Sequence, residues 1–281
     1  MTRVGRRPVR QLLVTTVALA AALSGGAALS GCAAPAAESA PAADTAPATD
    51  TTPGAASLSS GEVPAPAQRS PSPSPAGTVA EDGYSNPSAA TVVVNKRRPL
   101  EPIDYAPPEL VLPAVPLATD RANAMLRPDA AEALEGLFAA AAKDDVALTL
   151  VSGYRSYTVQ MDTYDYWVST NGSAEDADNY SARPGFSEHQ TGLAFDIGQD
   201  DGACTLRSCF GETAAGIWAA DNAHTFGFIL RYPEGRQETT GFLEESWHYR
   251  FVGTDTASSM RDGKVETLEE FAGLPGAPDY G

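Results

Sequence analysis

The hydrophobic and polar positions divide the chain into three parts. An apolar run extends from Leu12 to about Leu29. Residues 33–90 are rich in Ala, Pro, Ser, Thr and Gly and show no periodicity. Periodic apolar positions of the kind that a folded core needs begin only after residue 90. We therefore expect the globular domain at 91–265 and a C-terminal tail at 266–281.

Within the globular region the pattern predicts short helices and strands in mixed order. A helix is expected after Pro128, with Asp129 as its N-cap, because apolar residues at 134, 137, 138 and 141 share one helical face. A second helix is expected at 157–168, with Ser156 as its N-cap. The remaining predicted elements are a helix at 214–226 and strands at 92–94, 146–151, 194–197, 228–232 and 247–251. This order is typical of an α+β fold, with a small antiparallel sheet flanked by helices.

The N-terminus predicts export. Four arginines and no acidic residue precede the apolar run, which ends in Leu29-Ser30-Gly31-Cys32. This ending resembles a bacterial lipobox, so we expect a lipoprotein signal peptide at 1–32 and a lipid anchor on Cys32 at the outer face of the cell membrane. An uncleaved membrane span and an ordinary secretory signal are the alternatives. Residues 33–90 cannot bury enough apolar surface to fold, and we expect them to form a disordered tether.

The charge balance narrows the classes of partner. The chain has 36 acidic and 19 basic residues and a formal net charge of −17. Nucleic-acid binding needs basic patches that neutralise phosphate, so this balance argues against it. A solvated acidic surface that favours solubility is the simpler interpretation.

The cysteines predict one disulfide. If Cys32 carries lipid, Cys204 and Cys209 are left as an even pair in an exported protein, which favours a bond between them. Free thiols, or two sulfur ligands of a metal, are the alternatives. The four-residue spacing between them is a poor metal motif.

Three histidines limit where any imidazole-based site can lie. His189 precedes Asp196 by seven positions, and with His248 they make up two imidazoles and one carboxylate, the ligand set of a zinc site that leaves one position for water. Glu245 lies three residues before His248 and could act as a general base. These spacings alone favour a metal site only moderately. His224 has no acidic ligand in a suitable pattern, and we interpret it as structural.

Four stretches together resemble one family. The segments 152–156 (SGYRS), 181–197 (SARPGFSEHQTGLAFDI), 227–233 (GFILRYP) and 247–253 (WHYRFVG) are similar to the VanY-type D-alanyl-D-alanine carboxypeptidases of the LAS metallopeptidase group. The resemblance extends over about residues 92–262 in the family's order. It implies an LAS-type zinc peptidase fold and a hydrolase that acts on peptidoglycan.

The resemblance also implies roles for individual residues. It makes His189, Asp196 and His248 the ligands of one Zn²⁺ per chain and Glu245 the catalytic base. Arg155 matches the arginine that stabilises the tetrahedral oxyanion, a role that suits its fixed charge. The expected substrate-binding positions are Ser187, Gln160 and Trp247.

One position departs from the family pattern. The family often has proline between the catalytic glutamate and the tryptophan, where this chain has Ser246. Because this position is not a ligand, we expect a change in loop stiffness rather than a loss of activity.

The expected function is a D,D-carboxypeptidase that removes the terminal D-alanine from peptidoglycan stem peptides. The expected protein is a monomer that binds no nucleic acid. An L,D-carboxypeptidase, a D,D-dipeptidase of the same chemistry and a non-catalytic wall-binding lipoprotein are the alternatives.

Overall fold

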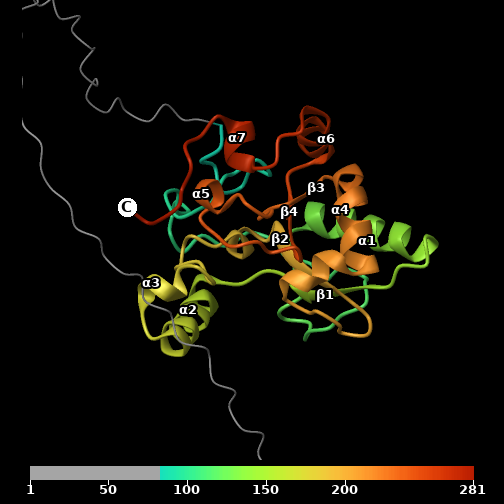
Figure 1. Ribbon diagram of the computed structural model, residues 1–281, viewed down its shortest axis with the longest axis horizontal. Helices are drawn as coiled ribbons and strands as arrows, with labels where there is room; N and C mark the ends of the chain where they lie inside the picture. The colour runs from blue at the N-terminus through green and yellow to red at the C-terminus, as the bar shows by residue number, and fades with distance from the viewer. Residues whose placement is uncertain (1–82) are drawn as a thin grey trace, which may run out of the picture. The chain divides into compact units, whose positions relative to one another are not determined.

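The computed structural model of the protein describes residues 83–281 (Figure 1). The predicted signal peptide, the lipid site at Cys32 and most of the predicted tether lie outside these residues. The last tether residues, 83–90, are described and pack on the domain. The carbonyl of Ser88 accepts a hydrogen bond from Arg127, and that of Ala90 accepts one from Arg250. The folded domain therefore begins before residue 91.

A four-stranded antiparallel sheet forms the centre of the domain (Figure 1). Its strands follow the order β1-β2-β4-β3. Their bounds are β1 Leu148–Ser152, β2 Ala194–Gln199, β3 Phe228–Leu230 and β4 His248–Phe251. This arrangement confirms the predicted α+β class. These four strands lie where the pattern predicted them, with ends that differ by at most two residues.

Helices surround this sheet. The α-helices are α1 Pro128–Lys143, α2 Tyr157–Asn171, α3 Ala174–Ala177, α4 Ala214–Asn222, α5 Gln237–Thr240, α6 Thr254–Gly263 and α7 Leu268–Ala272. Three short 3-10 helices are η1 Glu188–Thr191, η2 Ser208–Glu212 and η3 Ala223–Phe226. Helices α1 and α4 contact each other and the sheet, whereas α2 and α3 pack together as a separate pair beyond it (Figure 1).

The main hydrophobic core lies between α1 and the sheet. Leu134 and Leu137 of α1 are fully buried, and so are Leu150 of β1 and Phe195 of β2. Each such side chain contributes about 1.5–3 kcal/mol by leaving water. The apolar face predicted for α1 is therefore the face that packs into this core.

Two local predictions were wrong. The N-cap of α1 is Arg127, and Asp129 lies inside the first turn, because Pro128 takes the first helical position, where its missing N–H costs nothing. The Asp129 carboxylate instead accepts hydrogen bonds from the Arg127 guanidinium at 2.6 and 3.1 Å. Residues 92–94 are buried but form no strand, since the N–H groups of Val92 and Val93 donate to the carbonyls of Ala89 and Tyr84 rather than to the sheet.

The predicted helix 214–226 is divided. Helix α4 ends at Asn222, and η3 continues the path to Phe226 with tighter turns. Gly227 then closes η3 in the left-handed region, with φ of 84°. The predicted helix at 157–168 is present and longer, and Ser156 caps it by accepting a hydrogen bond from the Val159 N–H.

The C-terminal segment 266–281 is part of the domain rather than a tail outside it. Leu268 and Ala277 are fully buried. The hydroxyl of Tyr280 accepts a hydrogen bond from the backbone N–H of Arg183 at 2.8 Å. Within residues 83–281, none of the helices has the length and apolar character needed to cross a membrane.

Candidate metal centre

Three buried side chains converge at the middle of the sheet. His189 lies in η1, Asp196 in β2 and His248 at the start of β4. One ligand atom from each lies within 4.8 Å of the others. Asp196 and His248 face each other in the antiparallel β2–β4 register. The Asp196 carboxylate lies 2.9 Å from Nδ1 of His248 and 3.4 Å from Nε2 of His189.

The Nδ1 nitrogen of His189 has a hydrogen-bond partner outside the group of three residues. Its Nδ1 lies 2.7 Å from the carbonyl oxygen of Gly153, which directs Nε2 toward Asp196. Gly153 itself packs closely on the preceding backbone, since a Cβ there would lie 2.6 Å from the carbonyl oxygen of Met125. Such a partner on the outer nitrogen is common around metal-binding histidines. The sequence pattern singled out the glycine-containing motif but not this contact.

The donor set fits Zn²⁺. Two imidazole nitrogens and one carboxylate oxygen are the ligands that zinc takes in catalytic sites with an open fourth position. In this structure Nδ1 of His248 faces the centre, 2.9 Å from the Asp196 carboxylate. Its Nε2 is buried and has no hydrogen-bond partner among residues 83–281.

Burial and neighbouring charges together lower the pKa values of Asp196 and His189 and raise that of His248. Burial would raise the pKa of Asp196, but the two histidines outweigh it and hold that pKa well below its usual range. Burial lowers the pKa of His189. Burial would also lower the pKa of His248, but the carboxylates of Asp196 and Glu188 prevail and raise it to about 9. The centre therefore attracts positive charge.

Glu245 lies beside the three residues without joining them. Its carboxylate is 3.8 Å from Nδ1 of His248. Burial raises the pKa of Glu245 to about 7, with Asp196 contributing in the same direction and His248 opposing. A carboxyl group with a pKa near neutrality can both take and return a proton at physiological pH. This is the environment expected of a general base.

Arg155 faces the same pocket. Burial lowers its pKa, and the carboxylates of Asp196 and Glu245 counteract this effect. One guanidinium N–H donates to the side-chain oxygen of Gln160 at 2.9 Å. Gln160 is fully buried and donates in turn to Ser181 and to the carbonyl of Ala182. The structure therefore places Gln160 behind Arg155, as its support, rather than in the pocket wall.

A pocket of about 940 Å³ opens over the centre. Both Ser187 and Trp247 line it, together with the three converging residues, Glu245 and Arg155. The pattern analysis missed the aromatic side chains of Trp167 and Tyr180, which also line it and stack with ring centroids 5.5 Å apart. They come from α2 and from the segment after α3, so no local motif connects them with the centre. His224 lies elsewhere, in η3.

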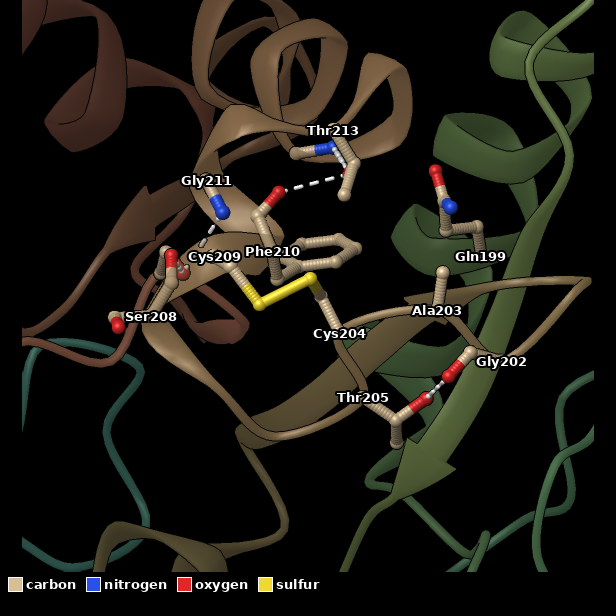
Figure 2. The surroundings of a disulfide bond; sticks show 12 residues. Gln199, Gly202, Ala203, Cys204, Thr205, Ser208, Cys209, Phe210, Gly211 and Thr213 are labelled. Atoms are coloured by element: carbon tan, nitrogen blue, oxygen red, sulfur yellow. Dashed lines mark hydrogen bonds between the residues drawn. A yellow bond between two sulfur atoms is a disulfide. The ribbon is translucent and has the colours of Figure 1, made fainter. Parts of the chain in front are cut away.

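The predicted disulfide joins Cys204 and Cys209 (Figure 2). The loop that it closes also lines the pocket, through residues 206–209. Ser246 connects this loop to the turn that carries Glu245. Its hydroxyl donates to the carbonyl of Ser208 and accepts from the N–H of Gly211, both at 3.1 Å. Where the family often has proline, this chain therefore holds the turn by two side-chain hydrogen bonds.

Replacing Ser246 with alanine is expected to lower the free energy of unfolding by about 1–2 kcal/mol, because it leaves two polar backbone groups without their partner. Urea denaturation followed by circular dichroism measures this change. The matched control is Ser208→Ala, which removes a hydroxyl but keeps the carbonyl that Ser246 contacts. Equal destabilisation by both substitutions would contradict a specific contribution from the Ser246 hydroxyl.

Comparison with known proteins identifies the family. The model of the family described as VanY, D-alanyl-D-alanine carboxypeptidase, matches residues 123–254. The chain is 36% identical to the bifunctional D-Ala-D-Ala dipeptidase and D-Ala-D-Ala carboxypeptidase VanXYC of Enterococcus gallinarum, over 64% of this chain and 91% of that protein.

Solved structures agree with this assignment. The LdcB LD-carboxypeptidase is similar with a TM-score of 0.62 and 41% identity, covering 66% of this chain and 86% of that one. A variant of the vancomycin-resistance D,D-pentapeptidase VanY in complex with Zn(II) gives a TM-score of 0.54 and 31% identity, covering 65% and 98%. With the family match, the extent of these similarities and the converging ligands, the chain belongs to the VanY D-alanyl-D-alanine carboxypeptidase family.

Proposed function

We propose that the chain is a zinc D,D-carboxypeptidase that removes the C-terminal D-alanine from peptidoglycan stem peptides. The observation that carries this proposal is the convergence of His189, Asp196 and His248 beside Glu245, in a pocket that Arg155 also lines. His189, Asp196 and His248 would hold one Zn²⁺. When bound, this ion supplies a Lewis acid and lowers the pKa of a water molecule toward neutrality.

The chain's own residues account for the proton transfers. Glu245 takes a proton from the attacking water, whose oxygen bonds to the penultimate carbonyl carbon. The peptide C–N bond then breaks, and Glu245 returns the proton to the departing amine of D-alanine. The guanidinium of Arg155 stabilises the negative charge that develops on the carbonyl oxygen. Gln160 keeps Arg155 in place through the 2.9 Å hydrogen bond.

An L,D-carboxypeptidase of the same chemistry is the second candidate. It is favoured by the similarity to the LdcB LD-carboxypeptidase, with 41% identity. The two activities differ in the length and stereochemistry of the stem peptide, which the pocket beyond the scissile bond must distinguish. Both leave the proposed roles of the metal ligands and of Glu245 unchanged.

Incubation with muramyl tetrapeptide, muramyl pentapeptide and free D-Ala-D-Ala, each with and without a chelator, separates these activities by product mass. Loss of one D-alanine from the pentapeptide alone, and only with metal, is the expected result. Loss of D-alanine from the tetrapeptide would show an L,D-carboxypeptidase, and cleavage of free D-Ala-D-Ala would show a dipeptidase. No product from any of these substrates, with metal present, would favour a wall-binding protein without activity.

We further propose that lipid on Cys32 anchors the enzyme outside the cell membrane, with residues 33–82 of the predicted tether linking the anchor to the domain. The lipobox-like ending of the apolar run supports this proposal. Cys32→Ala is expected to move the protein from the membrane fraction to the soluble extracytoplasmic fraction, as measured by fractionation and immunoblotting. Unchanged membrane retention would contradict the lipid anchor.

A further inference from the structure

We propose that Glu188 is a positioning residue for the metal centre, holding the His248 ring so that Nδ1 faces Asp196, where the zinc would be bound. The inference rests on the proposed zinc site and not on the length of the stem peptide. Glu188 immediately precedes His189 and had no assigned role in the sequence motif. Its side chain is fully buried, and one carboxylate oxygen, Oε2, lies 3.7 Å from Nε2 of His248.

The other carboxylate oxygen holds Glu188 in place. Its Oε1 accepts hydrogen bonds from Arg231 at 2.9 Å and from Arg250 at 2.7 Å. Both arginine side chains are fully buried. Because both guanidinium groups use Oε1, Oε2 is left without a hydrogen-bond partner among residues 83–281. It is the atom that faces His248.

The His248 ring is held between neighbours. Tyr232 stacks on it with ring centroids 4.9 Å apart, and His189 meets it edge-on at the same separation. Its Nδ1 lies 2.9 Å from Asp196, and its Nε2 has no hydrogen-bond partner in the described part of the chain. Two buried polar atoms without partners, Nε2 and the Glu188 Oε2, thus face each other about 0.5–1 Å beyond hydrogen-bond distance.

This geometry selects one form of the imidazole. A nitrogen that binds a metal must present a lone pair, so a His248 that binds through Nδ1 carries its proton on Nε2. A buried N–H without an acceptor costs about 1–3 kcal/mol. The Glu188 carboxylate is the acceptor within reach, and a small closing movement of the ring would satisfy both atoms. Carboxylates that accept from the outer nitrogen of a metal-binding histidine fix its orientation.

Glu188→Gln tests this assignment with little change of volume. The single amide oxygen of glutamine is needed by the donors of Arg231 and Arg250, so its NH₂ group would face the Nε2–H of His248. Two donors then oppose each other, which disfavours the form that binds metal through Nδ1. Zinc affinity, measured by competition with a chelator of known affinity, is expected to fall about 10–100-fold.

Glu269→Gln is the matched control. Glu269 is also fully buried and accepts two hydrogen bonds from Arg231, at 2.6 and 3.0 Å. It accepts a third from Asn95 at 2.9 Å, so its side-chain partners within residues 83–281 do not include a histidine. This substitution is expected to lower the melting temperature while zinc affinity stays within about twofold of wild type. Equal losses of zinc affinity in both variants would overturn the inference, because Glu188 would then act only by pairing with Arg231.

If the Glu188→Gln variant does not fold, the position of the His248 proton in the wild-type protein tests the inference instead. The chain has three histidines, so nitrogen NMR of the zinc-loaded protein gives few imidazole signals, and His224→Ala assigns one of them. We expect His248 to carry a slowly exchanging proton on Nε2. A proton on Nδ1 would overturn the inference. A wild-type protein that binds no zinc would instead overturn the zinc site itself, and the inference with it.

Discussion

Glu245→Gln is expected to reduce the turnover of the pentapeptide by roughly 10²–10⁴-fold while leaving zinc bound. Glutamine keeps the shape of the side chain but cannot accept the proton of the attacking water. Glu245 lies 3.8 Å from His248 and is not one of the three converging residues, so its replacement keeps all three proposed ligands. The measurements are kcat with muramyl pentapeptide and the zinc content of the purified variant.

Glu244→Gln is the matched control for this substitution. Glu244 is the preceding residue and also lines the pocket, yet it lies outside the group of converging ligands. Its replacement is expected to leave kcat close to that of wild type. Retained turnover in Glu245→Gln would refute the assignment of the base, and loss of zinc in that variant would make Glu245 a ligand instead.

His189→Ala is expected to abolish both zinc binding and turnover. The substitution removes one of three ligand side chains and leaves the Gly153 carbonyl without its 2.7 Å partner. Losing a ligand costs more than the roughly 10–100-fold in metal affinity that loss of an outer partner costs. Isothermal titration of the metal-free protein with zinc, and pentapeptide turnover at saturating zinc, measure the two effects.

His224→Ala provides the same chemical change away from the centre. His224 lies in η3, and its replacement is expected to preserve zinc stoichiometry and turnover. Loss of zinc in His224→Ala, or its retention in His189→Ala, would show that the ligand set has been assigned incorrectly. Comparing the two variants shows whether zinc binding depends on His189 in particular or is lost on removal of any histidine.

Local patterns predicted the features that depend on neighbours in sequence. Ser156 caps α2 because its hydroxyl reaches a backbone N–H three residues later, which a short motif specifies. Asp196 and His248 were both predicted to lie on strands, and the β2–β4 register then places them opposite each other. The wrong N-cap of α1 has a local cause too. Pro128 takes the first helical position, so the cap is the residue before it, Arg127, and not Asp129.

Contacts between residues far apart in the sequence could not be predicted from local motifs. Glu188 meets Arg231 and Arg250 across 43 and 62 residues of sequence, and Arg231 reaches Glu269 across a further 38. Nothing in the pattern distinguishes these charged residues from those of a solvated surface, because pairing is set by the tertiary fold. The same reason hid the packing of segment 266–281, since Leu268 and Ala277 become buried only through contacts set by the tertiary fold.

Glu188, Arg231, Arg250 and Glu269 form a buried cluster of charges beside His248. Its members come from distant parts of the chain and are therefore synthesised at different times. Arg250 donates to the carbonyls of Ala90 and Val92 from the start of the domain, whereas Glu269 is added near the end. Until Glu269 emerges, Arg231 would have to bury a guanidinium that is only partly paired, at a cost of several kcal/mol. A nascent chain that stops short of residue 269 is therefore expected to fold less stably around His248 than one that includes Glu269.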